Sequence, residues 1–180
     1  MSKPLTPDIY EKERVDYYLD GLVDLGDILS SENKLQKISS SILHLILGTL
    51  MFSKGGILLY NKRDKKLHVL AQRGIDFKKT DSEDIDDKLI INLLNKKIHT
   101  VGENDPDSNP FNLNKNLSSK LNSKIIVPLS YKNEFLGIVS LCKKFMNQAV
   151  SEMDHQILNI ICHHFSHAVH NSNLIVDLSK

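Results

Sequence analysis

Apolar residues recur at spacings of three and four along two stretches near the start of the chain. The first stretch predicts a helix of about five turns with a single apolar seam, as in a coiled coil. That seam is formed by Val15, Tyr18, Leu22, Leu25 and Leu29. A second helix is expected to follow, with Ser30 and Ser31 available to cap its first turn. Its buried face is formed by Leu35, Ile38, Ile42, Leu45 and Ile46.

The middle of the chain changes from helical spacing to short apolar runs. Gly55 and Gly56 are expected to break the second helix. The runs 57–60 and 67–71, joined by a polar turn, then predict a β-hairpin whose second strand closes at Gly74.

A third helix is expected after this hairpin, capped by Ser82, and a short strand follows over 98–101. The stretch 102–119 is polar, broken by prolines and long for a loop inside a compact domain. Long ordered loops of this kind are disproportionately functional.

The last third of the chain predicts a second hairpin and a long closing helix. The hairpin strands are 124–131 and 134–143, and Pro128 requires an edge or a bulge because it has no N–H to donate. The helix is expected to begin near Ser151 and to carry a seam that repeats nearly every 3.5 residues. That seam is formed by Leu158, Ile161, Phe165, Ala168, Ser172 and Ile175.

The composition is that of a folded, soluble protein with one domain. The 180 residues are 41% hydrophobic and 25% charged, and 23 lysines and arginines balance 22 aspartates and glutamates. A net charge of +1 gives no attraction for nucleic acid or a membrane surface, so neither is expected as a partner. Residues 1–14 lack the apolar core of a secretion signal, and the apolar stretch 42–52 is shorter than the ~20 residues that span a bilayer. The protein is therefore expected to be cytoplasmic.

The order of these elements, together with two sequence stretches, resembles GAF domains over about residues 19–175. In the second hairpin, Val-Pro-Leu at 127–129 is followed by Gly-Ile-Val at 137–139, and the last helix carries Ala168 and Asn171 in an Ala-x-x-Asn-like signature. The resemblance implies an α+β fold with a central antiparallel sheet of five to six strands. The first, second and last helices would cover one face, and a ligand pocket would lie under loops on the other.

The resemblance also implies a division of the chain and a role. Residues 1–14 would be a flexible arm, 15–176 the GAF domain with its dimerisation helices, and 177–180 the start of a linker or tail. GAF domains are mostly regulatory, so we expect a homodimer through the first and last helices, a small-molecule ligand, and an output domain such as a diguanylate cyclase in the full-length protein. The leading ligand is a cyclic nucleotide, cAMP before cGMP, with no covalent cofactor. The alternative is a GAF module that dimerises and binds no ligand.

Candidate ligand-binding residues follow from their places in that fold. They are Leu58, Tyr60, Arg73, Ile75, Asp76, Thr100, Phe111, Ser118, Ser119, Asn122 and Ser140. An apolar lining with a few hydroxyls and amides suits a purine, and a helix N-terminus at Ser118 suits a phosphate. Arg73 is the leading phosphate partner and Ser140 could face a purine edge. An arginine at a strand end and a serine in a half-buried strand are equally ordinary without a ligand.

The Asn-Lys-x-Asp-Glu signature of cyclic-nucleotide-binding members is only partly present. Lys144 occupies the lysine position, but a lysine replaces the asparagine and the Asp-Glu pair is altered around Asp154. This weakens the nucleotide hypothesis without excluding it, because the signature supports the pocket more than it contacts the ligand.

Enzyme and metal chemistry find little support in the residues. Cys142 and Cys162 are isolated, which indicates neither tetrapyrrole attachment nor the clustered thiols of a methionine sulfoxide reductase. His163, His167 and His170 share a helix face, and two imidazoles could share a divalent metal, but no carboxylate or thiol at fitting spacing completes a site. A polar or interfacial helix face is the commoner use of such histidines, and a pH-sensitive dimer interface fits them better than a metal. We expect no enzyme and no metal site.

Overall fold

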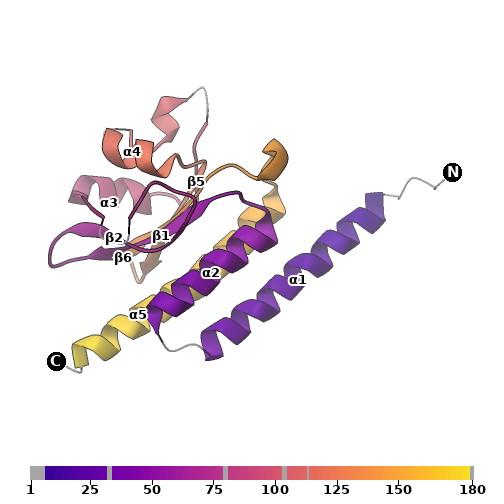
Figure 1. The fold of residues 1–180 in the computed structure, drawn as a ribbon, viewed down its shortest axis with the longest axis horizontal. Helices are drawn as coiled ribbons and strands as arrows, with labels where there is room; N and C mark the ends of the chain where they lie inside the picture. Colours follow the sequence, from indigo (N-terminus) through magenta and orange to yellow (C-terminus); the bar gives the residue numbers. More distant parts are fainter. Residues whose placement is uncertain (1–6, 32–33, 79–80, 103–104, 113, 179–180) are drawn as a thin grey trace.

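The computed structural model describes residues 7–31, 34–78, 81–102, 105–112 and 114–178. They form an antiparallel sheet with helices on both faces, which confirms the predicted α+β class (Figure 1). The strands are β1 (Gly55–Asn61), β2 (Lys66–Arg73), β3 (Ser82–Asp84), β4 (His99–Thr100), β5 (Ile125–Tyr131) and β6 (Glu134–Leu141). The helices are α1 (Pro7–Ser31), α2 (Leu35–Leu50), α3 (Asp87–Leu94), α4 (Lys115–Leu121) and α5 (Glu152–Leu178), with short 3-10 turns η1 (Pro106–Ser108) and η2 (Phe145–Asn147).

The sheet joins the two predicted hairpins into one layer. Its strand order is β3-β2-β1-β6-β5-β4, so hairpins β1–β2 and β5–β6 meet through the antiparallel pair β1–β6. Both edge strands are short, with three residues in β3 and two in β4. Because β4 pairs only with Ile125 and Ile126, Pro128 lies on a stretch of β5 whose outer edge has no strand partner, as its missing N–H predicted.

Strands β1 and β6, the central pair of the sheet, leave no room for a side chain at Gly137 on β6. Its φ is +154°, and a Cβ added there would lie 2.2 Å from the carbonyl oxygen of Leu58 on β1. Only glycine, which has no Cβ, accommodates both the backbone conformation and this distance. Gly137 is the first residue of the Gly-Ile-Val stretch on which the family resemblance rests.

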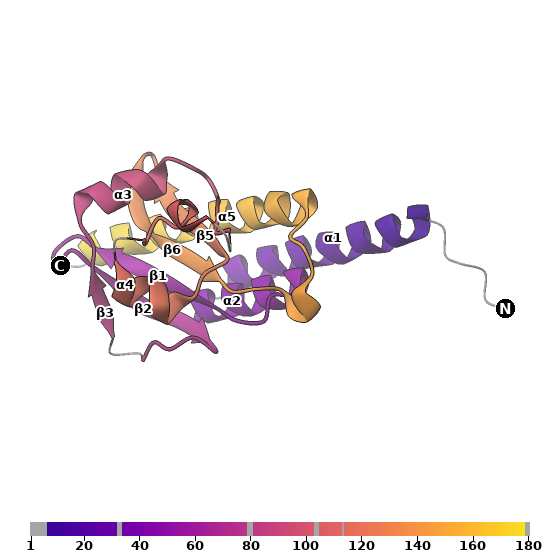
Figure 2. The ribbon, with the colours of Figure 1, turned by 90° about the horizontal axis from the view of Figure 1, so that it is seen from above.

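The helices form two unequal layers around the sheet. Helices α2 and α5 cover one face and α1 packs across them, while the shorter α3 and α4 lie over the other face (Figures 1 and 2). Figure 2 shows that the N-terminal end of α1 extends past the ends of α2 and α5. The arrangement matches the layers implied by the resemblance. None of the described helices has both the length and the apolar character needed to cross a membrane.

Many residues of the apolar seams of α1 and α5 are buried against other parts of the same chain. Tyr18 and Leu25 of α1 are buried, and Leu158, Ile161 and Phe165 of α5 are completely buried in the core next to the sheet. These seam residues therefore stabilise one chain by removing apolar surface from water. A dimer stays a prediction, and its contacts would come from other residues of the same helices.

The start of the chain differs from the expectation at both ends of α1. The helix begins at Pro7, so residues 7–14, expected to be part of a flexible arm, are helical. It ends at Ser31, and the Ser30 hydroxyl donates to the Asp27 carbonyl within its last turn, at 3.2 Å. The prediction that Ser30 and Ser31 cap α2 is therefore wrong; Lys34 occupies the cap position without a side-chain bond.

Two further local predictions are wrong because neighbouring residues play the predicted roles. Helix α2 ends at Leu50 because Met51 adopts a left-handed conformation, φ +62°, whereas Gly55 and Gly56 belong to β1 and do not break the helix. Ser82 belongs to β3 and does not cap α3. The cap is Asp86, whose Oδ1 accepts a hydrogen bond from the Leu89 amide at 2.8 Å.

Candidate ligand-binding face

The face of the sheet beneath α3 and α4 is filled by the protein's own side chains. Residues from four strands and from both short helices meet there in a single apolar cluster. Its buried members are Leu58, Leu67, Phe77, Ile85, Leu93, Phe111, Leu117, Leu121, Ile126, Phe135 and Ile138. The ring of Tyr60 packs at its margin, with its centroid 5.4 Å from that of Phe135. This second core fixes α3 and α4 against the sheet.

Four of the candidate ligand residues belong to this cluster or lie beside it. Leu58 and Phe111 are almost fully buried inside it, and Tyr60 and Ile75 pack against it. Ser140 is completely buried on β6, and its hydroxyl is hydrogen-bonded to that of Ser123. The structure thus brings the apolar candidates together as core residues.

The three candidates around α4 are already engaged in building that helix. Asn109 donates its side-chain amide to the Ser118 hydroxyl at 3.0 Å, and the Ser119 hydroxyl donates to the Asn116 carbonyl at 3.1 Å. Asn122 is the left-handed C-cap, φ +44°. The prediction of a helix N-terminus at Ser118 is wrong, because α4 starts at Lys115 and the Ser118 amide already donates to the Asn114 carbonyl.

The remaining candidates, Arg73, Asp76 and Thr100, are exposed to solvent. Arg73 closes β2 opposite Gly55, and Thr100 lies on the edge strand β4 opposite Ile125. A role in ligand binding stays a prediction for all of the candidate residues.

An open cavity of about 650 Å³ lies between α3 and the start of α4. Its lining combines two carboxylates, two lysines, several side-chain amides and an apolar floor. The lining residues are Asp84, Ile85, Asp86, Lys88, Leu89, Asn92, Pro110, Asn114, Lys115 and Asn116. The candidate residues predicted from the sequence are not among them. Asp86 and Asn114 are also the N-caps of α3 and α4, so the cavity opens where both helices begin.

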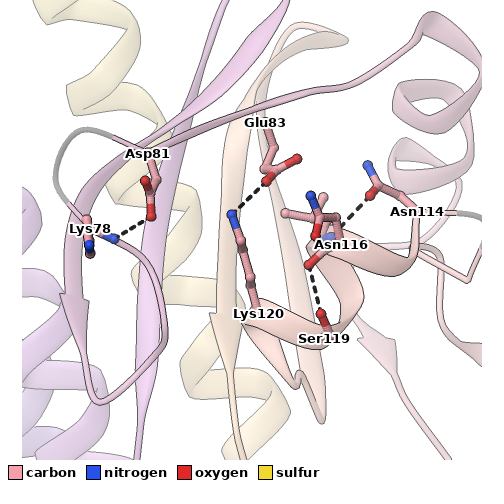
Figure 3. Close-up of polar contacts among 8 residues, drawn as sticks. Lys78, Asp81, Glu83, Asn114, Asn116, Ser119 and Lys120 are labelled. Carbon is pink, nitrogen blue, oxygen red and sulfur yellow. Dashed lines mark hydrogen bonds and ion pairs between the residues drawn. The ribbon is translucent and has the colours of Figure 1, made fainter.

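A polar clasp holds α4 over the sheet beside this cavity (Figure 3). Lys120 on α4 donates to Oε1 of Glu83 on β3 at 3.0 Å, and its ammonium group lies 5.1 Å from the centre of the Phe77 ring. The hydrogen bond to Glu83 raises the pKa of Lys120. At the other end of α4, Asn114 accepts from the Leu117 amide at 3.1 Å. The clasp joins residues far apart in sequence. It closes one side of the sheet face that lies under α3 and α4, which we call the loop face.

Two residues of the partial Asn-Lys-x-Asp-Glu signature form a buried ion pair on the side of the sheet covered by α1, α2 and α5, which we call the helix face. Lys144 Nζ lies 2.7 Å from Oδ2 of Asp154, and the Tyr18 hydroxyl donates to Oδ1 at 2.6 Å. Burial by itself would raise the pKa of Asp154, but the hydrogen bonds from Lys144 and Tyr18 outweigh it and lower that pKa. The Ser151 amide also donates to Oδ2, so the carboxylate joins α1, the segment after β6 and the start of α5.

The histidine face of α5 is packed against the hairpin β5–β6. The Tyr131 ring stacks on His170 with a centroid distance of 3.9 Å and meets His167 edge-on at 4.8 Å, and His163 lies 4.7 Å from His167. Within the part of the chain that the structure describes, no group of three or more His, Cys, Asp or Glu side chains is arranged to hold a metal ion.

Solved structures of the same architecture include GAF domains from several proteins. The chain matches the GAF domain of an Acinetobacter phosphoenolpyruvate-protein phosphotransferase with a TM-score of 0.65 and 15% identity, over 89% of this chain and 97% of that one. A phycocyanobilin-bound GAF domain from a cyanobacterial phytochrome gives 0.65 and 15%, over 87% and 96%. The free methionine-R-sulfoxide reductase of Neisseria meningitidis, solved with its substrate, gives 0.65 and 15%, over 88% and 91%.

No family model and no curated protein sequence matches this chain. The structural matches nevertheless extend over most of both chains in each comparison. The protein therefore has the GAF fold, which confirms the fold implied by the sequence resemblance. At 15% identity this likeness describes the architecture and not the ligand.

Proposed function

We propose that this protein is a ligand-sensing regulatory domain and that its ligand occupies the cavity between α3 and α4. The supporting observation is the cavity itself: its volume of about 650 Å³ is in the range of small-molecule sites, and polar groups converge above an apolar floor. Bound bilin in one GAF neighbour and bound substrate in another support a small-molecule role for this fold.

The chemistry of the lining favours a ligand that combines an apolar ring with a charged group. Lys88 and Lys115 can pair with a phosphate, and the side-chain amide of Asn92 can bond to the edge of a base. Leu89 and Pro110 supply apolar surface for the base itself. A cyclic nucleotide meets these requirements, and we place cAMP before cGMP on the strength of the family resemblance.

Thiol chemistry is not part of the proposal. Both cysteines of the chain are buried, and burial raises the pKa of each. The pKa of Cys162 reaches about 12, and the Cys142 thiol lies 3.5 Å from the Leu121 carbonyl. Because the thiolate is the reactive form, neither side chain suits a covalent tetrapyrrole or a reductase cycle. We therefore propose a non-enzymatic domain.

The proposed output route runs through α1 and α5. Both helices are anchored to Asp154, so a shift of the segment after β6 would reach both of them together. In the proposed full-length protein, α5 passes this shift to an output domain such as a diguanylate cyclase. The proposed homodimer would use exposed apolar residues of the two helices: Leu19 and Val23 on α1 and Met153 on α5.

The test is thermal unfolding with cAMP, cGMP, cyclic dinucleotides and linear nucleotides, each in millimolar excess. A specific ligand at 100 times its Kd adds about 2.7 kcal/mol to stability by mass action. The Lys88→Ala/Lys115→Ala variant should lose this shift, while Lys37→Ala/Lys143→Ala, which removes two exposed lysines elsewhere, should keep it. An unchanged unfolding temperature across the panel would refute the cyclic-nucleotide assignment.

The second candidate is a dimerisation module without a ligand. Its supporting observation is the apolar cluster under α3 and α4, where Phe77, Phe111 and Phe135 occupy the space next to the sheet. Sedimentation equilibrium distinguishes the two: a stable dimer with no response to the nucleotide panel favours this candidate. Leu19→Glu/Val23→Glu should then convert the dimer to a monomer.

A further inference from the structure

A second groove, of about 400 Å³, lies between α5 and β5, and its lining shares no residue with that of the α3–α4 cavity. It is formed by one face of α5, the open edge of β5, the C-terminal end of α3, and the connection between α3 and β4. Its lining residues are Leu94, Lys96, Lys97, Val127, Pro128, Ser130, Asn159, Ile160, Cys162, His163, His164 and Ser166. The groove exists because β4 ends after two residues and leaves the outer edge of β5 open beyond Ile126.

The charge of this groove differs from that of the chain as a whole. The protein has nearly equal numbers of acidic and basic residues, yet the groove is lined by two lysines and two histidines and by no carboxylate. Among the described residues, neither Lys96 nor Lys97 forms an ion pair. Such a set of donors without an acidic counterpart selects an anion.

The donors are carried by fixed parts of the fold. His99 is buried, and its Nε2 lies 2.7 Å from the Leu93 carbonyl, which closes the turn that presents Lys96 and Lys97. His99 also pairs with Ile126, so this turn is tied to β5. On α5, the ring of His163 is held between those of His164 and His167, at 5.6 and 4.7 Å. A site on fixed elements loses little entropy when a ligand binds.

The groove also offers apolar and neutral polar surface. Pro128 and Ile160, which are both accessible to solvent, give it an apolar wall, and Ser130 and Asn159 add a hydroxyl and an amide. An inorganic ion would leave the apolar wall exposed to water. The lining is therefore matched by a small molecule with an anionic head and an apolar body.

We propose that this groove is a binding site for a small phosphate monoester with an apolar body. The dianionic phosphate pairs with Lys96 and Lys97 and accepts hydrogen bonds from His163 and His164, whereas the body packs on Pro128 and Ile160. The site is separate from the α3–α4 cavity, so it stands or falls independently of the proposed sensory ligand.

Calorimetric titration of the whole chain with phenyl phosphate tests the proposal. We expect saturable one-site binding, with amide NMR shifts at Ser130 and Asn159. Inorganic phosphate, benzoate and phenol should each bind at least tenfold more weakly. Inorganic phosphate lacks the apolar body, benzoate lacks the second negative charge, and phenol lacks a charge. Benzoate binding as tightly as phenyl phosphate would overturn the phosphate assignment, and equal binding of inorganic phosphate would overturn the role of the apolar wall.

Variants separate this groove from nonspecific attraction to lysine. Lys96→Ala/Lys97→Ala should weaken phenyl phosphate binding at least tenfold, and Ser130→Phe should block it without changing charge. The Lys37→Ala/Lys143→Ala control removes the same charge from exposed positions elsewhere and should bind like the unmodified protein. Equal losses in both double-lysine variants, or no binding by the unmodified protein, would overturn the proposal whatever the nucleotide panel shows.

Discussion

The two faces of the sheet are each closed by a helix that a lysine–carboxylate pair ties down, but the two pairs lie in different surroundings. Lys144 and Asp154 are 5% and 1% exposed under the long helices, whereas Lys120 and Glu83, which hold α4, are 29% and 13% exposed. A fully buried pair is costly to break because removing one partner leaves an uncompensated charge, and the cost falls as water gains access to the pair. We therefore expect the side of the sheet under α1, α2 and α5 to open locally less readily than the side under α3 and α4.

The largest effect is expected from breaking the buried pair. Asp154→Ala should reduce the free energy of unfolding by about 3–5 kcal/mol, because Lys144 would stay buried without a counter-charge. Urea denaturation measures the change. Asp16→Ala, on the exposed side of α1, should leave stability almost unaffected.

Replacing both partners sharpens this prediction. The double variant Asp154→Leu/Lys144→Met should be more stable than Asp154→Ala, because no buried charge is left unpaired. A double variant no more stable than Asp154→Ala would mean that packing of the aspartate, and not its charge, holds the helix face.

The next largest effect is expected at the strand pair that both faces share. Gly137→Ala should cost about 2–4 kcal/mol, since it combines an unfavourable backbone conformation with a clash against the Leu58 carbonyl. Gly26→Ala is the matched control: no atom lies within 4 Å of its added Cβ on α1, and it should stabilise by about 0.5–1 kcal/mol. Equal effects of the two substitutions in urea denaturation would contradict the close β1–β6 approach.

Acid should destabilise the folded protein in part through Asp154. The pKa of Asp154 is lower in the folded protein than in the unfolded chain, so its contribution is present above the unfolded value of about 4 and is lost as pH falls through the folded value. Stability measured by urea between pH 7 and pH 2 should therefore fall less steeply for Asp154→Asn than for the unmodified protein. Parallel curves would show that other carboxylates dominate acid unfolding.

The smallest effect is expected at the clasp, whose two side chains are partly exposed. Lys120→Ala should lower the global unfolding midpoint less than Asp154→Ala does, because water reaches the Lys120–Glu83 pair more readily than the buried pair. Hydrogen exchange should instead become faster at the α4 amides and stay unchanged in α2. Faster exchange throughout the domain would show that the clasp supports the whole fold. That result would contradict the proposed difference between the two faces of the sheet.

The regular elements of the fold were predictable because they depend on local periodicity. The spacing of apolar residues predicted α2 and α5, and turn residues between short runs predicted both hairpins. Errors arose where several residues could play one role: Asp86 caps α3 in place of Ser82, and Met51 ends α2 ahead of Gly55. Competition of this kind is decided by tertiary packing, which periodicity does not contain.

The candidate site was less predictable because its walls come from segments distant in the chain. The cavity combines residues 84–92 with residues 110–116, and each stretch by itself resembles an ordinary helix start. Asp86 and Asn114 carried a readable capping signal, but nothing local indicated that the two helix starts face one another. Placement by family resemblance instead selected Leu58 and Phe111, which serve as core.

Pro128 also bears on whether the sheet edge could pair with another chain. The bare edge of β5 beyond Ile126 would otherwise present backbone donors and acceptors to the edge of any other chain, the geometry from which β-aggregates grow. A proline there removes one donor from the row, and the neighbouring turn with Lys96 and Lys97 places two positive charges beside it. A second copy aligned along this strand would lack one hydrogen bond and would be repelled by the positive charges of the turn. The edge of β5 that forms the groove is therefore also protected from strand addition.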